Sequence, residues 1–168
     1  MKPIAAIAAA AALFLGAADQ SQAAGFSPVQ IFTGFTQTHM HTEATTQIIA
    51  TVSISKQRMD LQMIDGYGTT EVAVWKVSTG RTGFETPTGE FKPTWTDIDH
   101  TSDTYDNAPM PFAVFFTGGY AVHATEYVKH LGKPASHGCV RLAPENAQAF
   151  YELVQRYGKA NTRIVITA

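Results

Sequence analysis

The sequence predicts a mostly β domain with one substantial α-helix in its C-terminal half. Short runs of alternating or β-branched apolar residues recur between turns that contain glycine, as is typical of antiparallel strands. Near the C-terminus the spacing becomes helical, because Ala147, Phe150 and Val154 repeat on one face. Pro144 suits the first turn of this helix and Gly158 marks its end.

Three strands are expected at the start of the domain. Residues 48–54 are rich in β-branched side chains, and residues 59–63 alternate between apolar and polar side chains. Valines mark a third run at residues 72–77, and short turns separate the three runs. This arrangement predicts an antiparallel meander. Residues 164–166 are expected to add a closing strand.

The middle of the chain is expected to contain two loops and a hairpin. Residues 78–95 are rich in Thr, Gly and Pro, a composition that fits a binding loop or a plain surface connection. Residues 96–109 carry four aspartates but lack the turn glycine and terminal glutamate of a calcium loop, so we expect a solvated excursion. Residues 110–116 and 120–123 are apolar and flank a Gly-Gly turn, which predicts a hairpin.

The first 23 residues are expected to be a secretory signal peptide. Lys2 gives a positive start, Ile4 to Gly16 is apolar and alanine-rich, and cleavage is predicted between Ala23 and Ala24. An uncleaved anchor is the alternative, but the apolar stretch is shorter than the ~20 residues that span a bilayer. We therefore expect an exported protein of the periplasm or cell wall, without a membrane span after cleavage.

Residues 24–46 are expected to form a polar lead-in segment, and residues 47–168 to form one domain with its own core. The formal net charge of -2 gives no electrostatic support for nucleic-acid binding. His39 and His41 would face one side of an extended chain, but no third ligand is near them and zinc needs three or four. We therefore expect a monomer without a nucleic-acid partner, metal or organic cofactor.

The only cysteine of the chain, Cys139, lies in the polar motif Ser136-His137-Gly138-Cys139. A thiol attacks as its thiolate, and a neighbouring imidazole, here His123 or His137, commonly removes its proton. An unpaired cysteine in an exported protein needs a reason, because oxidising compartments favour disulfides. Reactivity is one reason. A mixed disulfide with a partner and a small buried hydrophobe are the alternatives.

Four segments together resemble the L,D-transpeptidase catalytic domain of the YkuD type. SHGCVRL at residues 136–142 is the most specific of them. The others are VSTG at residues 77–80, TPTG at residues 86–89, and MPF at residues 110–112 leading to YAVH at residues 120–123. The resemblance covers roughly residues 48–166. It implies a mixed, β-sandwich-like fold and makes residues 47–168 the catalytic domain.

The resemblance implies a cysteine-dependent acyltransferase that acts on peptidoglycan stem peptides. Cys139 would attack the third residue of a tetrapeptide stem, expel the terminal D-alanine and hold the rest as a thioester. An amine of a second stem, or a protein amine, would resolve the thioester and so cross-link the wall or attach a protein to it. The resemblance implies no metal and no cofactor, and it makes acylation by carbapenems an expectation.

The resemblance also assigns the base. His123 is the expected general base, and the main-chain carbonyl of Ala124 is expected to orient its imidazole. His137 is the rival, because residues two apart in an extended segment face the same side.

The other motif residues have expected supporting roles. The N–H groups of Gly138 and Cys139 are expected to bind the developing oxyanion. Ser136 would support the motif, and Arg141 would either hold the motif or pair with a substrate carboxylate. Three further residues of the matching segments are expected to contact substrate: Met110, Phe112 and Tyr120.

Several other functions stay open at this point. Water as the acceptor would make the protein an L,D-carboxypeptidase, and the sequence does not separate the two. A non-catalytic wall-binding protein could retain the fold, although the intact Cys139 and His123 argue against it. Sortases share the His-then-Cys order but have their arginine farther downstream, and papain-like peptidases have the opposite order.

Overall fold

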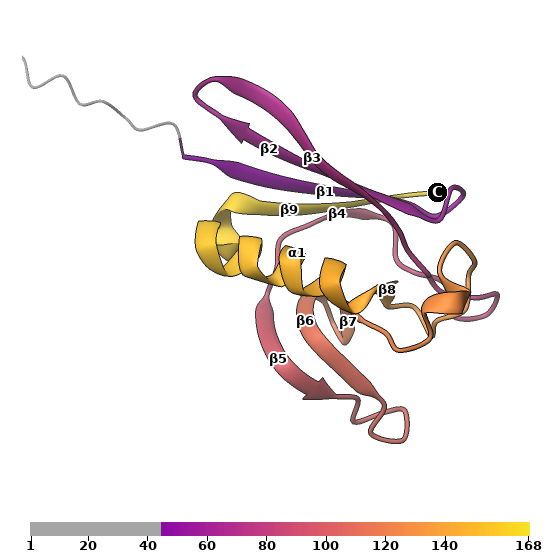
Figure 1. Cartoon of the computed structure of the whole chain (residues 1–168). Helices are drawn as coiled ribbons and strands as arrows, with labels where there is room; N and C mark the ends of the chain where they lie inside the picture. Colours follow the sequence, from indigo (N-terminus) through magenta and orange to yellow (C-terminus); the bar gives the residue numbers. More distant parts are fainter. Residues whose placement is uncertain (1–44) are drawn as a thin grey trace, which may run out of the picture. The chain divides into compact units, whose positions relative to one another are not determined.

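The computed structural model of the protein describes residues 45–168, which form two β-sheets and one long helix (Figure 1). The expected signal peptide and most of the expected lead-in segment, including His39 and His41, lie outside the described residues. The elements are β1 (Gln47–Ser53), β2 (Arg58–Asp65), β3 (Gly68–Lys76), β4 (Gly89–Phe91), β5 (Trp95–Thr101), β6 (Pro109–Thr117), β7 (Tyr120–Ala124), η1 (Val128–His130), β8 (Val140–Leu142), α1 (Pro144–Tyr157), η2 (Lys159–Asn161) and β9 (Thr162–Thr167). The predicted fold class, mostly β with one substantial helix, is confirmed.

The larger sheet has five strands in the order β3-β2-β1-β9-β4. Strands β1, β2 and β3 pair antiparallel, so the predicted meander is confirmed. Strand β9 pairs parallel to β1, with Ala50 opposite Ile164, and antiparallel to β4. The predicted strand at residues 164–166 is confirmed as part of β9, and it lies inside the sheet between β1 and β4.

The smaller sheet has four strands in the order β5-β6-β7-β8. Strands β6 and β7 form the predicted hairpin, and the turn between them contains Gly118 at a φ of 48°. Strand β8 pairs parallel to β7, with Val122 opposite Val140 and His123 opposite Arg141. This parallel pairing joins the two segments of the chain that carry the expected chemistry.

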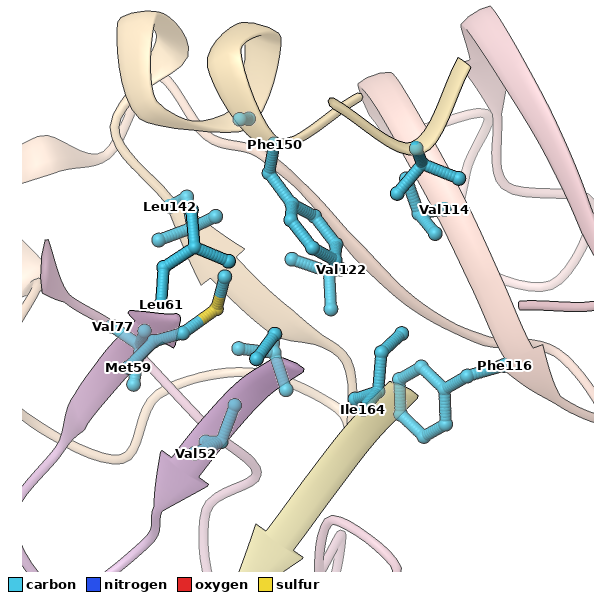
Figure 2. Close-up of a cluster of buried hydrophobic side chains, with 14 of the residues drawn as sticks. Val52, Met59, Leu61, Val77, Val114, Phe116, Val122, Leu142, Phe150 and Ile164 are labelled. Atoms are coloured by element: carbon cyan, nitrogen blue, oxygen red, sulfur yellow. The ribbon is translucent and has the colours of Figure 1, made fainter. Parts of the chain in front are cut away.

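Helix α1 lies between the two sheets and packs mainly against β6 and β7 (Figure 1). Pro144 occupies its first turn and Gly158, at a φ of 87°, caps its end, as predicted. Phe150 is fully buried and extends from α1 toward Val122 of β7 (Figure 2). Apolar residues of both sheets complete this core, among them Val52, Met59, Leu61, Val114, Phe116, Leu142 and Ile164.

Two segments that were expected to be loops contain strands. The acidic segment 96–109 does not form one solvated excursion, because β5 takes Trp95–Thr101 and pairs antiparallel with β6. Strand β5 is the edge of its sheet, and exposed carboxylates are tolerated on an edge strand because one side of it meets water. Within residues 78–95, the three residues of β4 pair with β9.

The third strand of the meander is confirmed, but its valines point away from the core. Val72 and Val74 are 42% and 46% exposed, whereas Ala73 and Trp75 pack against the core. Val77, just beyond the strand, is fully buried.

Across residues 45–168, helices fall short of the length and apolar character that crossing a membrane would require.

Candidate active site

The pairing of β7 with β8 places the expected catalytic residues on one face of the smaller sheet. His123 lies opposite Arg141, and Cys139 comes directly before β8, two residues from Arg141. Opposed residues share a face, and residues two apart in an extended chain also share a face. His123, Cys139 and Arg141 therefore project to the same side, and all three line one cavity.

Hydrogen bonds within the motif hold the chain at Cys139 in a tight bend. The Ser136 hydroxyl donates to the carbonyl of Cys139 at 2.6 Å and accepts from the N–H of Gly138 at 3.0 Å. The buried hydroxyl of Thr86 donates to the carbonyl of Gly138 at 2.8 Å and accepts from the N–H of Gly80 at 2.9 Å. Thr86 belongs to the TPTG segment, so this segment directly supports the cysteine motif.

Fewer main-chain N–H donors are available to an oxyanion than the sequence suggested. The N–H of Gly138 is already bonded to Ser136, so it is not available for an oxyanion in this structure. The N–H of Cys139 has no hydrogen-bond acceptor within the described part of the chain. Of the two expected donors, only Cys139 therefore stays a candidate.

Gly138 is required by its conformation and by its surroundings. Its φ is +110°, and a Cβ at this position would overlap the ring of Tyr120. We expect Gly138→Ala to lower the free energy of unfolding by about 3 kcal/mol or more, measured by urea unfolding. Gly132→Ala is the matched control, because Gly132 has a φ of +92° but open space around it, so it should cost only about 1 kcal/mol. Equal losses in the two variants would show that the Tyr120 contact does not matter.

The VSTG segment at residues 77–80 is anchored to the larger sheet by a buried glutamine. The side chain of Gln57, in the turn between β1 and β2, donates to the hydroxyl of Thr79 and accepts from its N–H. Ser78 exchanges two main-chain hydrogen bonds with Arg141, at 2.9 and 3.0 Å. The VSTG segment therefore connects the larger sheet to β8, a role that the composition of residues 78–95 did not reveal.

His123 is buried and its tautomer is determined by one hydrogen bond. Nδ1 lies 2.7 Å from the carbonyl of Ala124. Because a carbonyl only accepts, Nδ1 carries the proton and Nε2 of the neutral ring keeps its lone pair. Burial lowers the pKa of His123 to about 4, although the bond to Ala124 opposes this shift, so the ring is neutral at pH 7.

The burial of His123 also makes the stability of the fold depend on pH. The unfolded chain binds a proton at this ring near pH 6.5, whereas the folded protein does so only near pH 4. The contribution of neutral, buried His123 to the free energy of unfolding is complete above pH 6.5. It is lost as the pH falls toward 4, which lowers the free energy of unfolding by about 3 kcal/mol. Urea unfolding at pH 7 and pH 4 should show this loss in the wild type. In His123→Gln, the fall in the free energy of unfolding between pH 7 and pH 4 should be smaller by about 3 kcal/mol. An equal pH dependence in the two proteins would show that His123 is not its source.

His137 makes contacts that occupy its ring. Arg81 Nη2 lies 2.7 Å from His137 Nε2, and because a guanidinium only donates, Nε2 acts as the acceptor. Tyr105 stacks on the same ring with 4.3 Å between centroids, and Phe84 meets it edge-on at 4.7 Å. The lone pair that a base would use is therefore engaged. Sequence reasoning missed Arg81 and Tyr105, because neither lies in a motif and their contacts exist only in the fold.

Cys139 is half-buried and reaches the cavity. On its buried side it packs against Met110, Ala113, Phe115 and Ala121. Burial raises the pKa of its thiol, while a main-chain hydrogen bond from Ala121 and the charge of Arg141 oppose the rise. The thiol and the imidazole of His123 are therefore both neutral at pH 7.

The cavity beside Cys139 has a volume of about 1120 Å³. Met110, Phe112 and Tyr120, the expected substrate-contact residues, all line it. Tyr105 and its neighbours between β5 and β6 form another part of the wall, although this segment was expected to be a solvated excursion. Residues 45–168 contain no cluster of three or more histidine, cysteine or acidic side chains that could hold a metal ion.

The model of the YkuD L,D-transpeptidase catalytic domain matches residues 47–166. The chain belongs to this family. The resemblance read from the four sequence segments is thereby confirmed. No curated protein sequence matches the chain.

Solved structures of L,D-transpeptidases share the fold of this YkuD domain. One from Mycobacterium smegmatis has a TM-score of 0.64 and 23% identity, over 73% of this chain and 59% of that one. One from Mycobacterium tuberculosis H37Rv has a TM-score of 0.63 and 21% identity, over 73% and 58%. L,D-transpeptidase 3 from Mycobacterium tuberculosis, in complex with a faropenem-derived adduct, has a TM-score of 0.59 and 20% identity, over 73% of this chain and 61% of that one. The matched region is thus about three-fifths of each of these proteins.

Proposed function

We propose that this YkuD domain is a peptidoglycan L,D-transpeptidase with Cys139 as its nucleophile. The observation that carries the proposal is the shared face of β7 and β8, where His123 and Cys139 line one cavity. Cys139 attacks the carbonyl of the third residue of a tetrapeptide stem, D-alanine leaves, and the stem is held as a thioester. An acceptor amine then attacks the thioester and releases the thiol.

The neutral resting state of the pair favours proton transfer during the attack over a thiolate formed beforehand. Nε2 of His123 accepts the thiol proton as the sulfur bonds to the carbonyl, and returns a proton to the leaving amine. The Ala124 carbonyl stabilises the imidazolium that forms, because its oxygen accepts a hydrogen bond from Nδ1–H, with 2.7 Å between Nδ1 and the oxygen. The N–H of Cys139 is our candidate donor to the oxyanion.

Several features of the whole protein belong to the same proposal. Residues 1–23 act as a signal peptide, residues 24–46 as a lead-in segment and residues 47–168 as the catalytic domain, which works as a monomer in the periplasm or cell wall. The relative from Mycobacterium tuberculosis that carries a faropenem-derived adduct supports a further expectation. Carbapenems and penems should acylate Cys139.

Incubation with a disaccharide tetrapeptide tests the proposal. Intact-mass spectrometry of the protein should show a thioester, and mass spectrometry of the muropeptides should show cross-linked dimers. Trimmed tripeptide monomers without dimers would instead identify water as the acceptor and the protein as an L,D-carboxypeptidase. The absence of both products and of the thioester would refute an acyl-transfer function.

A further inference from the structure

Arg141 lines the catalytic cavity without a carboxylate partner among the described residues. Its only hydrogen bond within residues 45–168 from the side chain is a long one, from Nη1 to the carbonyl of Ala135 at 3.5 Å. A guanidinium has five N–H donors, so most of its hydrogen-bonding capacity is unused. Because the side chain is half-buried, water replaces these bonds only in part, and an anion in the cavity would compensate the charge.

The main chain of Arg141 is held on both sides. Its N–H and C=O bond to Ser78, and it pairs with His123 across the parallel ladder. The guanidinium therefore starts from a fixed point on the face that carries Cys139. A site of this kind suits a planar carboxylate, which a guanidinium can bind with two parallel hydrogen bonds.

We propose that Arg141 binds the C-terminal carboxylate of the donor peptide and thereby restricts attack by Cys139 to the last peptide bond. This assignment rests on the proposed acyl-transfer function. The terminal carboxylate lies one residue, at most about 3.6 Å, beyond the scissile carbonyl. Arg141 lies two residues, about 6.6 Å along an extended chain, from Cys139, so its side chain starts within reach.

The other acidic or basic side chains that line the cavity within residues 45–168, histidines apart, are carboxylates. Asp106 and Glu126 also line it, and neither forms an ion pair with Arg141. Both carboxylates would repel an anionic peptide end. Among the described residues that line the cavity, Arg141 is the one with a guanidinium, which can attract the anionic peptide end.

Two donor peptides that differ in one group test the proposal. One is a tetrapeptide stem that ends in D-alanine, and the other is the same peptide with a C-terminal carboxamide. The wild type should form the thioester about 10- to 100-fold faster with the acid, the range for hydrogen bonds to a charged group. Arg141→Met should lose this preference by slowing the acid alone, and Arg141→Lys should keep part of it. Arg163→Met is the matched control, because Arg163 is exposed on β9 outside the cavity, and it should keep the full preference.

Equal rates with the two peptides in the wild type would overturn the proposal without any variant. An Arg141→Met protein that slows both peptides to the same extent would also overturn it, because that result indicates a purely structural role. Binding of both peptides to Cys139→Ala by calorimetry separates this inference from the proposed chemistry. A preference for the acid in binding supports the role of Arg141 even if the wild type forms no thioester, and equal binding contradicts it.

Discussion

Replacing Cys139 with alanine is expected to abolish thioester formation with a tetrapeptide stem. The rate of cross-linking should fall by a factor of about 10⁴ or more, because removing the nucleophile removes the covalent pathway and leaves only binding and oxyanion contacts. The measurement is the intact mass of the protein after incubation with substrate. The cross-linked product should disappear in the same proportion.

The fold of Cys139→Ala should stay intact, since the side chain is small and half-buried. The variant loses the packing of one sulfur atom against its apolar neighbours, the main-chain hydrogen bond from Ala121 and a weak contact with the carbonyl of Gly119 at 3.8 Å. Thermal unfolding close to that of the wild type would show that the loss is chemical. An undiminished mass adduct in this variant would place the nucleophile elsewhere and would refute the mechanism.

Replacing His123 with alanine is expected to slow thioester formation by a factor of 10² to 10⁴, which is typical of the loss of a general base. The pH dependence gives a second readout. Wild-type acylation should be nearly constant between pH 6 and 8 and should fall only as His123 protonates near pH 4. In His123→Ala the rate should instead rise about tenfold per pH unit, because the thiolate must then form without help.

His137→Ala is the matched control for the base. Its Nε2 already accepts a hydrogen bond from Arg81, so we expect a loss of less than tenfold and a pH profile like that of the wild type. A larger loss in His137→Ala than in His123→Ala would exchange the two roles.

Local patterns in the sequence predicted most elements of the fold. The meander β1-β2-β3, the β6–β7 hairpin and α1 each carry their own periodicity and their own turn or cap residues, so neighbouring residues alone predict them. Strand β5 escaped prediction because five of its seven residues are polar, two of them aspartates. Its pairing partner β6, not its own composition, makes it a strand.

The candidate site was predicted in its residue types but not in its electrostatics. The motif at residues 136–142 and the strand that ends at His123 were both recognisable from the sequence. Whether the thiol and imidazole rest as ions depends on how deeply each is buried, and burial of both favours the neutral pair. The contacts of Arg81 and Tyr105 with His137 were likewise invisible, because they join loops that are distant in the sequence.

The sequence by itself determined the family, the nucleophile candidate, the β1-β2-β3 meander, the β6–β7 hairpin and helix α1, because those depend on residue types at short spacing. Only the tertiary structure decided which histidine has a free nitrogen, that the N–H of Gly138 is already engaged, and that Arg141 faces the cavity without a carboxylate partner among the described residues. Each of these depends on the parallel pairing of β7 with β8 and on loops packed around it. Such contacts arise when burial brings distant segments together, so no local pattern encodes them.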